Sequence, residues 1–199
     1  MTFIETVPAD AATGEVAAMY DADRELRGFL PNYTQAFSHR PGVYTAWRQL
    51  VGAITQNMDP RRYELVSVAA ARVLRSTYCT AAHSGVLADR FLEPAAVAAL
   101  VNDPLAAGLD ETDSAVIELA ENVARDASSV QQSDIDRLRG AGLSDAEIFD
   151  VVVAAALRSF FAKTLDGLGA QADAQFAQRF DGGLLDAVTV GRPFASVGE

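Results

Sequence analysis

Cysteine, histidine and tryptophan are scarce in this sequence of 199 residues, which contains one cysteine, two histidines and one tryptophan. A lone cysteine cannot form an intramolecular disulfide, so the fold must be stable without covalent cross-links, as is usual in a reducing compartment. No set of His, Cys, Asp and Glu residues has the spacing of a metal site. We therefore expect neither a metal nor another cofactor.

Long hydrophobic runs and basic clusters are also lacking. The longest apolar run has about seven residues, whereas a bilayer-spanning helix needs roughly 20. The first residues, "MTFIETVPADAATGEV", are acidic and lack the pattern of a signal peptide. A formal net charge of −11 disfavours binding to phosphate backbones and anionic lipid. We expect a cytoplasmic protein with no nucleic-acid or membrane partner.

The residues that are abundant favour helices. The chain is 50% hydrophobic but only 8% aromatic, and alanine-rich runs such as "VAAARVL" and "VVVAAAL" favour close-packed helices over sheet. Periodicity and capping signals divide the chain into about ten helical segments without a low-complexity linker. The sequence predicts one all-α domain over 1–199. Its parts are N-terminal helices in 1–58, a helix pair in 59–92 and C-terminal helices in 93–199.

One internal repeat stands out. Shifting the chain by 83 positions aligns Glu64 to His83 with Glu147 to Asp166, with six identities in twenty. This match predicts a bundle built from two related helical halves, in which a helix pair packs against its own copy. The second copy, in the degenerate repeat 144–166, has Ala162 and Asp166 in place of Cys79 and His83.

The stretch "LRSTYCTAAHSG" contains the candidate reactive group. Ser76 or Thr77 can cap a new helix, which places Cys79 in a first turn, where free amide N–H groups favour a thiolate and lower the thiol pKa. His83 lies four residues later on the same face, within hydrogen-bonding reach of the sulfur. The alternative is structural, because a free cysteine is among the most buried residue types.

The spacing of these residues resembles that of a known superfamily. Glu64, Ser76, Tyr78, Cys79 and His83 are similar to the signature of the alkylhydroperoxidase-like (AhpD-like) and carboxymuconolactone decarboxylase superfamily, whose thiol members have E, eleven residues, C-x-x-C, three residues and H. The segments from about residue 7 to 180 resemble its peroxidase-related branch. The resemblance implies an AhpD-like helical bundle and a homo-oligomer.

The same resemblance implies roles for these residues. Cys79 would be the nucleophile, His83 its base, Glu64 the carboxylate that orients His83, and Ser76 and Tyr78 polar neighbours. The chain departs from the thiol members at Ser76, where they have a resolving cysteine. Because a serine cannot form a disulfide, oxidised Cys79 would need an outside thiol or a thioredoxin-like protein as reductant.

The resemblance thus implies a thiol oxidoreductase that uses a single cysteine to reduce peroxides or exchange thiols. Two other functions stay open. A cofactor-free lyase or isomerase could use His83 and Glu64 as acid and base on a carboxylated or lactone-like small molecule. A degenerate member would be a ligand-binding or oligomer-forming scaffold.

Two geometric expectations follow from the same segments. Fifteen residues of continuous helix would separate Glu64 from Cys79 by about 22 Å, so the helix must break at Ser76. Either the two pieces then cross steeply, or water or a partner subunit lies between the two groups. The wide apolar run that ends in Phe160 and Phe161 predicts either the central helix of the subunit or a face against a neighbour, in which case one of these two rings lies in a symmetric subunit contact.

Overall fold

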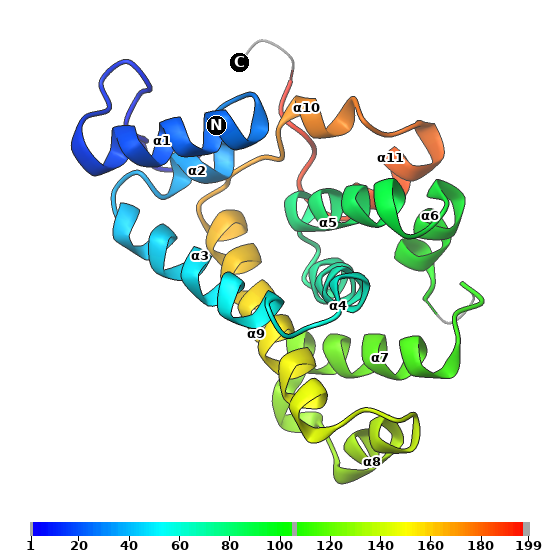
Figure 1. Ribbon diagram of the computed structural model, residues 1–199. Helices are drawn as coiled ribbons and strands as arrows, with labels where there is room; N and C mark the ends of the chain where they lie inside the picture. Colours follow the sequence, from blue (N-terminus) through cyan, green and yellow to red (C-terminus); the bar gives the residue numbers. More distant parts are fainter. Residues whose placement is uncertain (1, 105–106, 197–199) are drawn as a thin grey trace.

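Helices form the whole regular structure of the part of the chain that the computed structural model describes, residues 2–104 and 107–196. This confirms the predicted all-α class. Figure 1 shows the helices arranged around α4, which is surrounded by α5, α7 and α9. The elements are α1 Gly14–Arg27, α2 Asn32–Ala36, α3 Pro41–Thr55, α4 Pro60–Val73, α5 Thr77–Arg90, α6 Pro94–Asn102, α7 Glu111–Asp126, the 3-10 helix η1 Ala127–Ser129, α8 Gln132–Gly140, α9 Asp145–Gly167, α10 Ala174–Ala177 and α11 Gly182–Val188.

Local sequence signals account for where the two central helices begin. The Asp59 carboxylate accepts the Arg62 amide N–H at 2.8 Å, and Pro60 occupies the first turn of α4, where its missing N–H costs nothing. At the start of α9, Ser144 and Glu147 form a capping box, and its S-x-x-E pattern is one of the capping signals in the sequence. Both helices therefore start where the sequence predicts.

The internal repeat has a different form in its second copy. The first copy spans α4 and α5, which are separated by a bend, whereas the second lies within α9, a single unbroken helix. The expectation of a repeated helix pair is thus not met, because nothing interrupts the hydrogen-bond ladder of α9 at Ser159, the counterpart of Ser76. The two copies do pack against each other, since α4 lies against α9.

The core has two parts that meet along α5 and α9. The larger part is aliphatic and lies among α4, α6, α7 and α9. The smaller part is aromatic and lies among α1, α2, α3, α5 and the second half of α9; it includes Tyr78 and Cys79. Trp47 is half-buried and stacks on Phe161 with ring centroids 4.0 Å apart. The candidate nucleophile therefore lies in the aromatic part of the core.

Phe160 and Phe161 have opposite environments. Phe161 is buried and stacks on Phe37 and Trp47, so it belongs to the interior of the subunit. Phe160 is 45% exposed on the outer side of α9. Phe160 alone of these two rings is therefore available for a subunit contact.

Candidate functional site

A sharp bend joins α4 to α5 and positions the candidate residues. Arg75 adopts the left-handed conformation, with φ of 56°, and Ser76 is extended, so the chain leaves α4 and restarts as α5 in a new direction. Figure 1 shows α4 nearly end-on while α5 runs across the view. The structure therefore has the steep crossing, one of the arrangements that the sequence left open, and this crossing allows Glu64 of α4 to reach His83 of α5.

The C-terminal segment packs against this bend. The Gly191 amide donates to Thr77 Oγ1 at 2.9 Å, and Arg75 Nε donates to the Val190 carbonyl at 3.2 Å. A Cβ at position 191 would lie 1.8 Å from the Arg75 carbonyl oxygen, so only glycine permits the close approach. The strained bend is thus fixed by residues more than a hundred positions away, which local sequence patterns did not indicate.

Glu64 and His83 form a short hydrogen bond, with His83 Nδ1 2.5 Å from Glu64 Oε2. The carboxylate fixes the tautomer: Nδ1 carries the proton that is donated to Glu64, which leaves the Nε2 lone pair free to accept another. Burial lowers the pKa of His83, the charge of Arg158 lowers it further, and Glu64 opposes both effects. His83 is therefore a neutral imidazole at neutral pH and is able to act as a base.

Cys79 lies beside an arginine that the sequence analysis did not identify. The sulfur is 3.9 Å from Arg158 Nη1, and Arg158 Nη2 donates to the Tyr63 hydroxyl at 3.1 Å. Both Cys79 and Arg158 are buried. An arginine within the apolar run "VVVAAALRSFFAK" was the available signal, because a buried charge is rare unless it is paired or functional.

Two expectations about the thiol are corrected by this geometry. Burial raises the pKa of Cys79, with Arg158 opposing the rise, whereas the helix-terminus argument predicted a lowered pKa. The reason is that the desolvation of a buried thiolate destabilises it more than the N–H groups of the first helical turn stabilise it. Furthermore, no hydrogen bond joins Cys79 to His83 among the described residues, because His83 Nδ1 is committed to Glu64 and the sulfur faces Arg158.

Ser76 and Tyr78, predicted as polar neighbours of the thiol, are both buried at the start of α5 close to Cys79. The Tyr78 hydroxyl donates to Asp173 and accepts the Tyr33 amide N–H at 3.0 Å, so it braces α5 against α2 and α10. Burial raises the pKa of Tyr78 well above its ordinary value. The buried Ser76 hydroxyl forms no hydrogen bond of normal geometry, although it is near enough to Cys79 and Asp166 to lower the pKa of each slightly.

A cavity of about 440 Å³ brings Glu64, His83, Cys79 and Arg158 together. Its walls come from α1, α2, α3, α4, α5, α9 and α10, and aromatic rings form much of them, including Tyr33, Tyr44, Trp47 and Phe176. The Glu64–His83 pair and the thiol thus face one space that can hold a small molecule. Ser76 does not line it.

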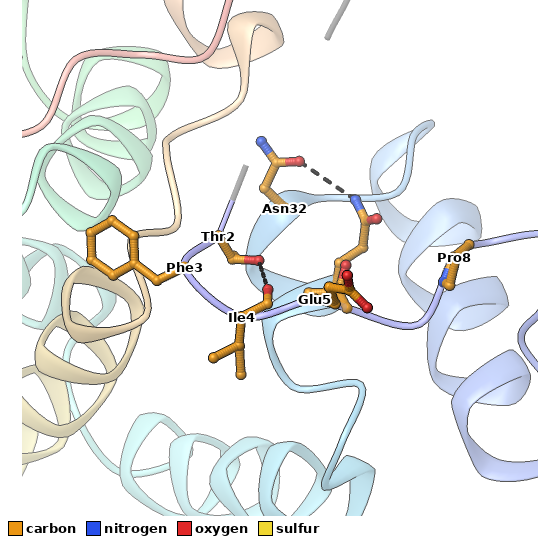
Figure 2. Close-up of a pocket in the computed structure, with 8 residues that line it drawn as sticks. Thr2, Phe3, Ile4, Glu5, Pro8 and Asn32 are labelled. Atoms are coloured by element: carbon orange, nitrogen blue, oxygen red, sulfur yellow. Dashed lines mark hydrogen bonds between the residues drawn. The ribbon is translucent and has the colours of Figure 1, made fainter.

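A second hollow lies at the N-terminal segment and has none of this chemistry. Figure 2 shows Thr2, Ile4, Glu5 and Pro8 beside Asn32, with Phe3 turned away from Glu5. The two hydrogen bonds drawn in Figure 2 are local, from Thr2 to the Ile4 carbonyl and from Gln35 to Asn32. Glu5 is its only titratable side chain. We therefore place the candidate site in the first cavity.

Residues 2–104 and 107–196 offer neither a metal site nor a membrane-spanning helix. No cluster of three or more His, Cys, Asp or Glu side chains in these ranges is arranged to hold a metal ion. None of the helices described there combines the length and the apolar character that a bilayer crossing requires.

Fold and site together define an all-α protein with one buried cysteine beside an arginine and a Glu–His pair. No protein-family model and no curated protein matches the chain. Solved structures do match it: the chain has the fold of the alkylhydroperoxidase AhpD core, as its motif predicted.

Three of these structures cover nearly the whole chain. A peroxidase-related protein from Ralstonia eutropha JMP134 with the AhpD core has a TM-score of 0.79 and 19% identity, over 88% of this chain and 94% of its own. A peroxidase-related protein from Silicibacter sp. TM1040 has a TM-score of 0.79 and 18% identity, over 88% of this chain and 93% of its own. A cysteine-to-alanine variant of the debrominase Bmp8, in complex with 2,3,4-tribromopyrrole, has a TM-score of 0.75 and 14% identity, over 94% and 100%.

Proposed function

We propose that this protein is a single-cysteine reductase, in which Cys79 attacks an electrophilic atom of a small molecule bound in the aromatic cavity. The observation that carries the proposal is that Cys79 and Arg158 share this cavity with the Glu64–His83 pair. Peroxide oxygen is the first electrophile to test, in keeping with the peroxidase-related proteins that share the fold. The debrominase of the same fold adds an activated halogen as a second electrophile.

Proton transfer to His83 activates the thiol in this scheme. In the resting site both groups are neutral, because burial raises the pKa of Cys79 and lowers that of His83. When substrate binds, Nε2 of His83 takes the thiol proton, directly or through one water, and Arg158 stabilises the thiolate that forms. Glu64 holds the imidazolium through Nδ1–H.

The peroxide reaction then balances in three steps. The thiolate attacks the distal peroxide oxygen, the O–O bond breaks, and the imidazolium returns its proton to the leaving alkoxide, giving an alcohol and a Cys79 sulfenic acid. An outside thiol condenses with the sulfenic acid to a mixed disulfide and water. A second outside thiol then reduces this disulfide and regenerates Cys79. The outside thiol is required because Ser76 cannot resolve the sulfenic acid.

The decisive test is mass spectrometry of Cys79 after one equivalent of cumene hydroperoxide, with and without glutathione. We expect one added oxygen without glutathione and a glutathione adduct with it. Cys79→Ser should abolish peroxide consumption. His83→Gln should reduce turnover by about 10²-fold, the usual contribution of a general base. His39→Gln is the matched control, because His39 is the other histidine and lies exposed outside the cavity.

A lyase or isomerase is the second candidate, because the Glu64–His83 pair is complete without the thiol. Acid–base chemistry on a small carboxylated substrate would survive Cys79→Ser and be lost in His83→Gln. An unmodified protein with neither peroxide consumption nor acid–base turnover would leave only the scaffold role. Peroxide consumption that persists in Cys79→Ser would contradict the proposed reductase.

A further inference from the structure

Arginines gather at the cavity although the protein as a whole is acidic. The chain has 16 basic residues and a formal net charge of −11, yet four arginines line this one cavity: Arg27, Arg48, Arg158 and Arg179. Two carboxylates line it, those of Asp23 and Glu64. The walls therefore hold an excess of positive charge that is absent from the molecule as a whole.

The two carboxylates are already engaged by other groups. Asp23 is fully buried and accepts from Thr34 Oγ1 at 2.5 Å, from the Tyr44 hydroxyl at 2.6 Å and from Arg48 Nη1 at 2.8 Å. Glu64 accepts from His83. Arg48 is thus neutralised by Asp23, and Arg179 is paired with Asp89 on α5.

Arg158 and Arg27 are left without such a partner. Among the described residues, neither forms an ion pair with a carboxylate, and the buried Arg158 also has an Nε–H without a hydrogen-bond acceptor. The partners of Arg158 are the Cys79 sulfur and the Tyr63 hydroxyl. The charge of Glu64 acts on Arg158, but no carboxylate of the described residues contacts the guanidinium, and its Nε–H has no acceptor. An anion bound beside it would therefore satisfy a buried donor that the protein leaves unpaired. The charges of Arg158 and Arg27 both act on His83, whose pKa they lower, so they reach the same part of the cavity.

We infer that the cavity binds a small aromatic acid in its anionic form, with the acidic group held by Arg158 and Arg27 and the ring held against the aromatic wall. This inference rests on the proposed function in one respect: it names a substrate class for the same site. The cavity volume of about 440 Å³ suits one substituted ring, and Tyr33, Tyr44 and Trp47 supply its apolar surface. The anion also supplies the hydrogen-bond acceptor that the buried guanidinium lacks.

Binding can be measured without turnover, because Trp47 is the only tryptophan and lines the cavity. Benzoate and benzamide are the probes: they have nearly the same shape and differ in charge. They are titrated into the Cys79→Ser protein while Trp47 fluorescence is recorded. We expect benzoate to bind at least about tenfold more tightly than benzamide, and only benzoate binding to weaken as salt is raised.

Variants of the two arginines locate the anion. Arg27→Gln should weaken benzoate binding about tenfold and leave benzamide binding unchanged. Arg24→Gln is the matched control: it removes a positive charge one turn earlier on α1 from a residue paired with Asp21 outside the cavity. Arg158→Gln should have a larger effect than Arg27→Gln, and Arg158→Lys should restore part of the binding if the charge is what matters.

Equal binding of benzoate and benzamide, or an equal loss in the Arg24 and Arg27 variants, would overturn the inference. If Arg158→Gln fails to fold, Arg27→Gln decides, because Arg27 is exposed and its substitution leaves the packed core in place. The readout is independent of thiol chemistry. Benzoate selectivity together with an inert Cys79 would therefore reject the reductase and keep the anion site, whereas a reactive Cys79 with no selectivity would do the opposite.

Discussion

Glu64 and His83 lie on different helices, nineteen residues apart in the chain, and their side chains meet at 2.5 Å. Both side chains are mostly buried, with 13% and 15% of their surface exposed. In such a setting the carboxylate controls both the orientation and the basicity of the imidazole. The first prediction tests this relationship.

Glu64→Gln should lower kcat/KM for peroxide about tenfold, because the amide holds the ring less firmly and does not stabilise the imidazolium. The pH profile of kcat/KM should change as well. Glu64 raises the pKa of His83 against the effect of burial, so its removal should lower that pKa further. Because His83 acts as a base when neutral, the acid limb of the profile should move to lower pH. An acid limb that moves to higher pH would contradict the assigned pairing.

The rate of Cys79 alkylation should report a raised thiol pKa. Burial raises the pKa above the ordinary 9.0, so the rate with iodoacetamide should keep increasing with pH beyond that value. Arg158→Met removes the charge that opposes the rise and should move the midpoint to still higher pH. Arg158→Lys should move it less. A midpoint below 8 in the unmodified protein would restore the helix-terminus explanation.

Asp23→Ala should destabilise the protein by about 2–4 kcal/mol, because it leaves the Thr34 and Tyr44 hydroxyls and the Arg48 guanidinium without their shared acceptor. Urea unfolding followed by circular dichroism measures the loss. Asp21→Ala is the control: Asp21 is exposed and pairs with Arg24 alone, so its removal should cost less than about 0.5 kcal/mol. Equal losses in the two variants would refute the buried network around Asp23.

Ser76→Cys should create a disulfide with Cys79. Position 76 is the N-cap of α5 and position 79 lies three residues later, an arrangement in which capping side chains normally meet. Mild oxidation should remove two hydrogens from the mass and block alkylation of both thiols. Thr80→Cys is the control, since it adds a second thiol directly after Cys79 that points to another side of the helix. Two free thiols after oxidation of Ser76→Cys would show that the bend holds the side chains apart.

The homo-oligomer remains a prediction. Because Phe161 is buried and Phe160 is exposed, the variant that tests it is Phe160→Asp. Exposed apolar side chains lie on the neighbouring helices α3 and α9, namely Val43, Leu50, Phe149 and Phe160. Phe160→Asp should lower the mass measured by light scattering towards the 21.1 kDa of one chain while the helix content is retained. Phe161→Asp should unfold the protein, because Phe161 is buried among Phe37 and Trp47. Ile4→Asp is the control, equally exposed at 45% but on the N-terminal segment. A wild-type mass of one chain would contradict the oligomer.

The sequence by itself determined the helical class, the starts of α4 and α9, and the candidate residues Glu64, Cys79 and His83. Apolar periodicity and capping act over a few residues and can be seen in the chain directly. The need for a break at Ser76 also followed from the sequence, since a continuous helix would hold Glu64 and Cys79 far apart.

Only the tertiary structure decided what the site contains and how it is charged. Arg158 comes from α9 and the aromatic wall from α2, α3 and α10, so no local spacing links them to Cys79. The direction of the Cys79 pKa shift depended on the same packing, because the burial created by distant helices outweighs the favourable first turn of α5. The bend itself is fixed by Gly191, whose close approach to Arg75 is a long-range contact that no sequence pattern encodes.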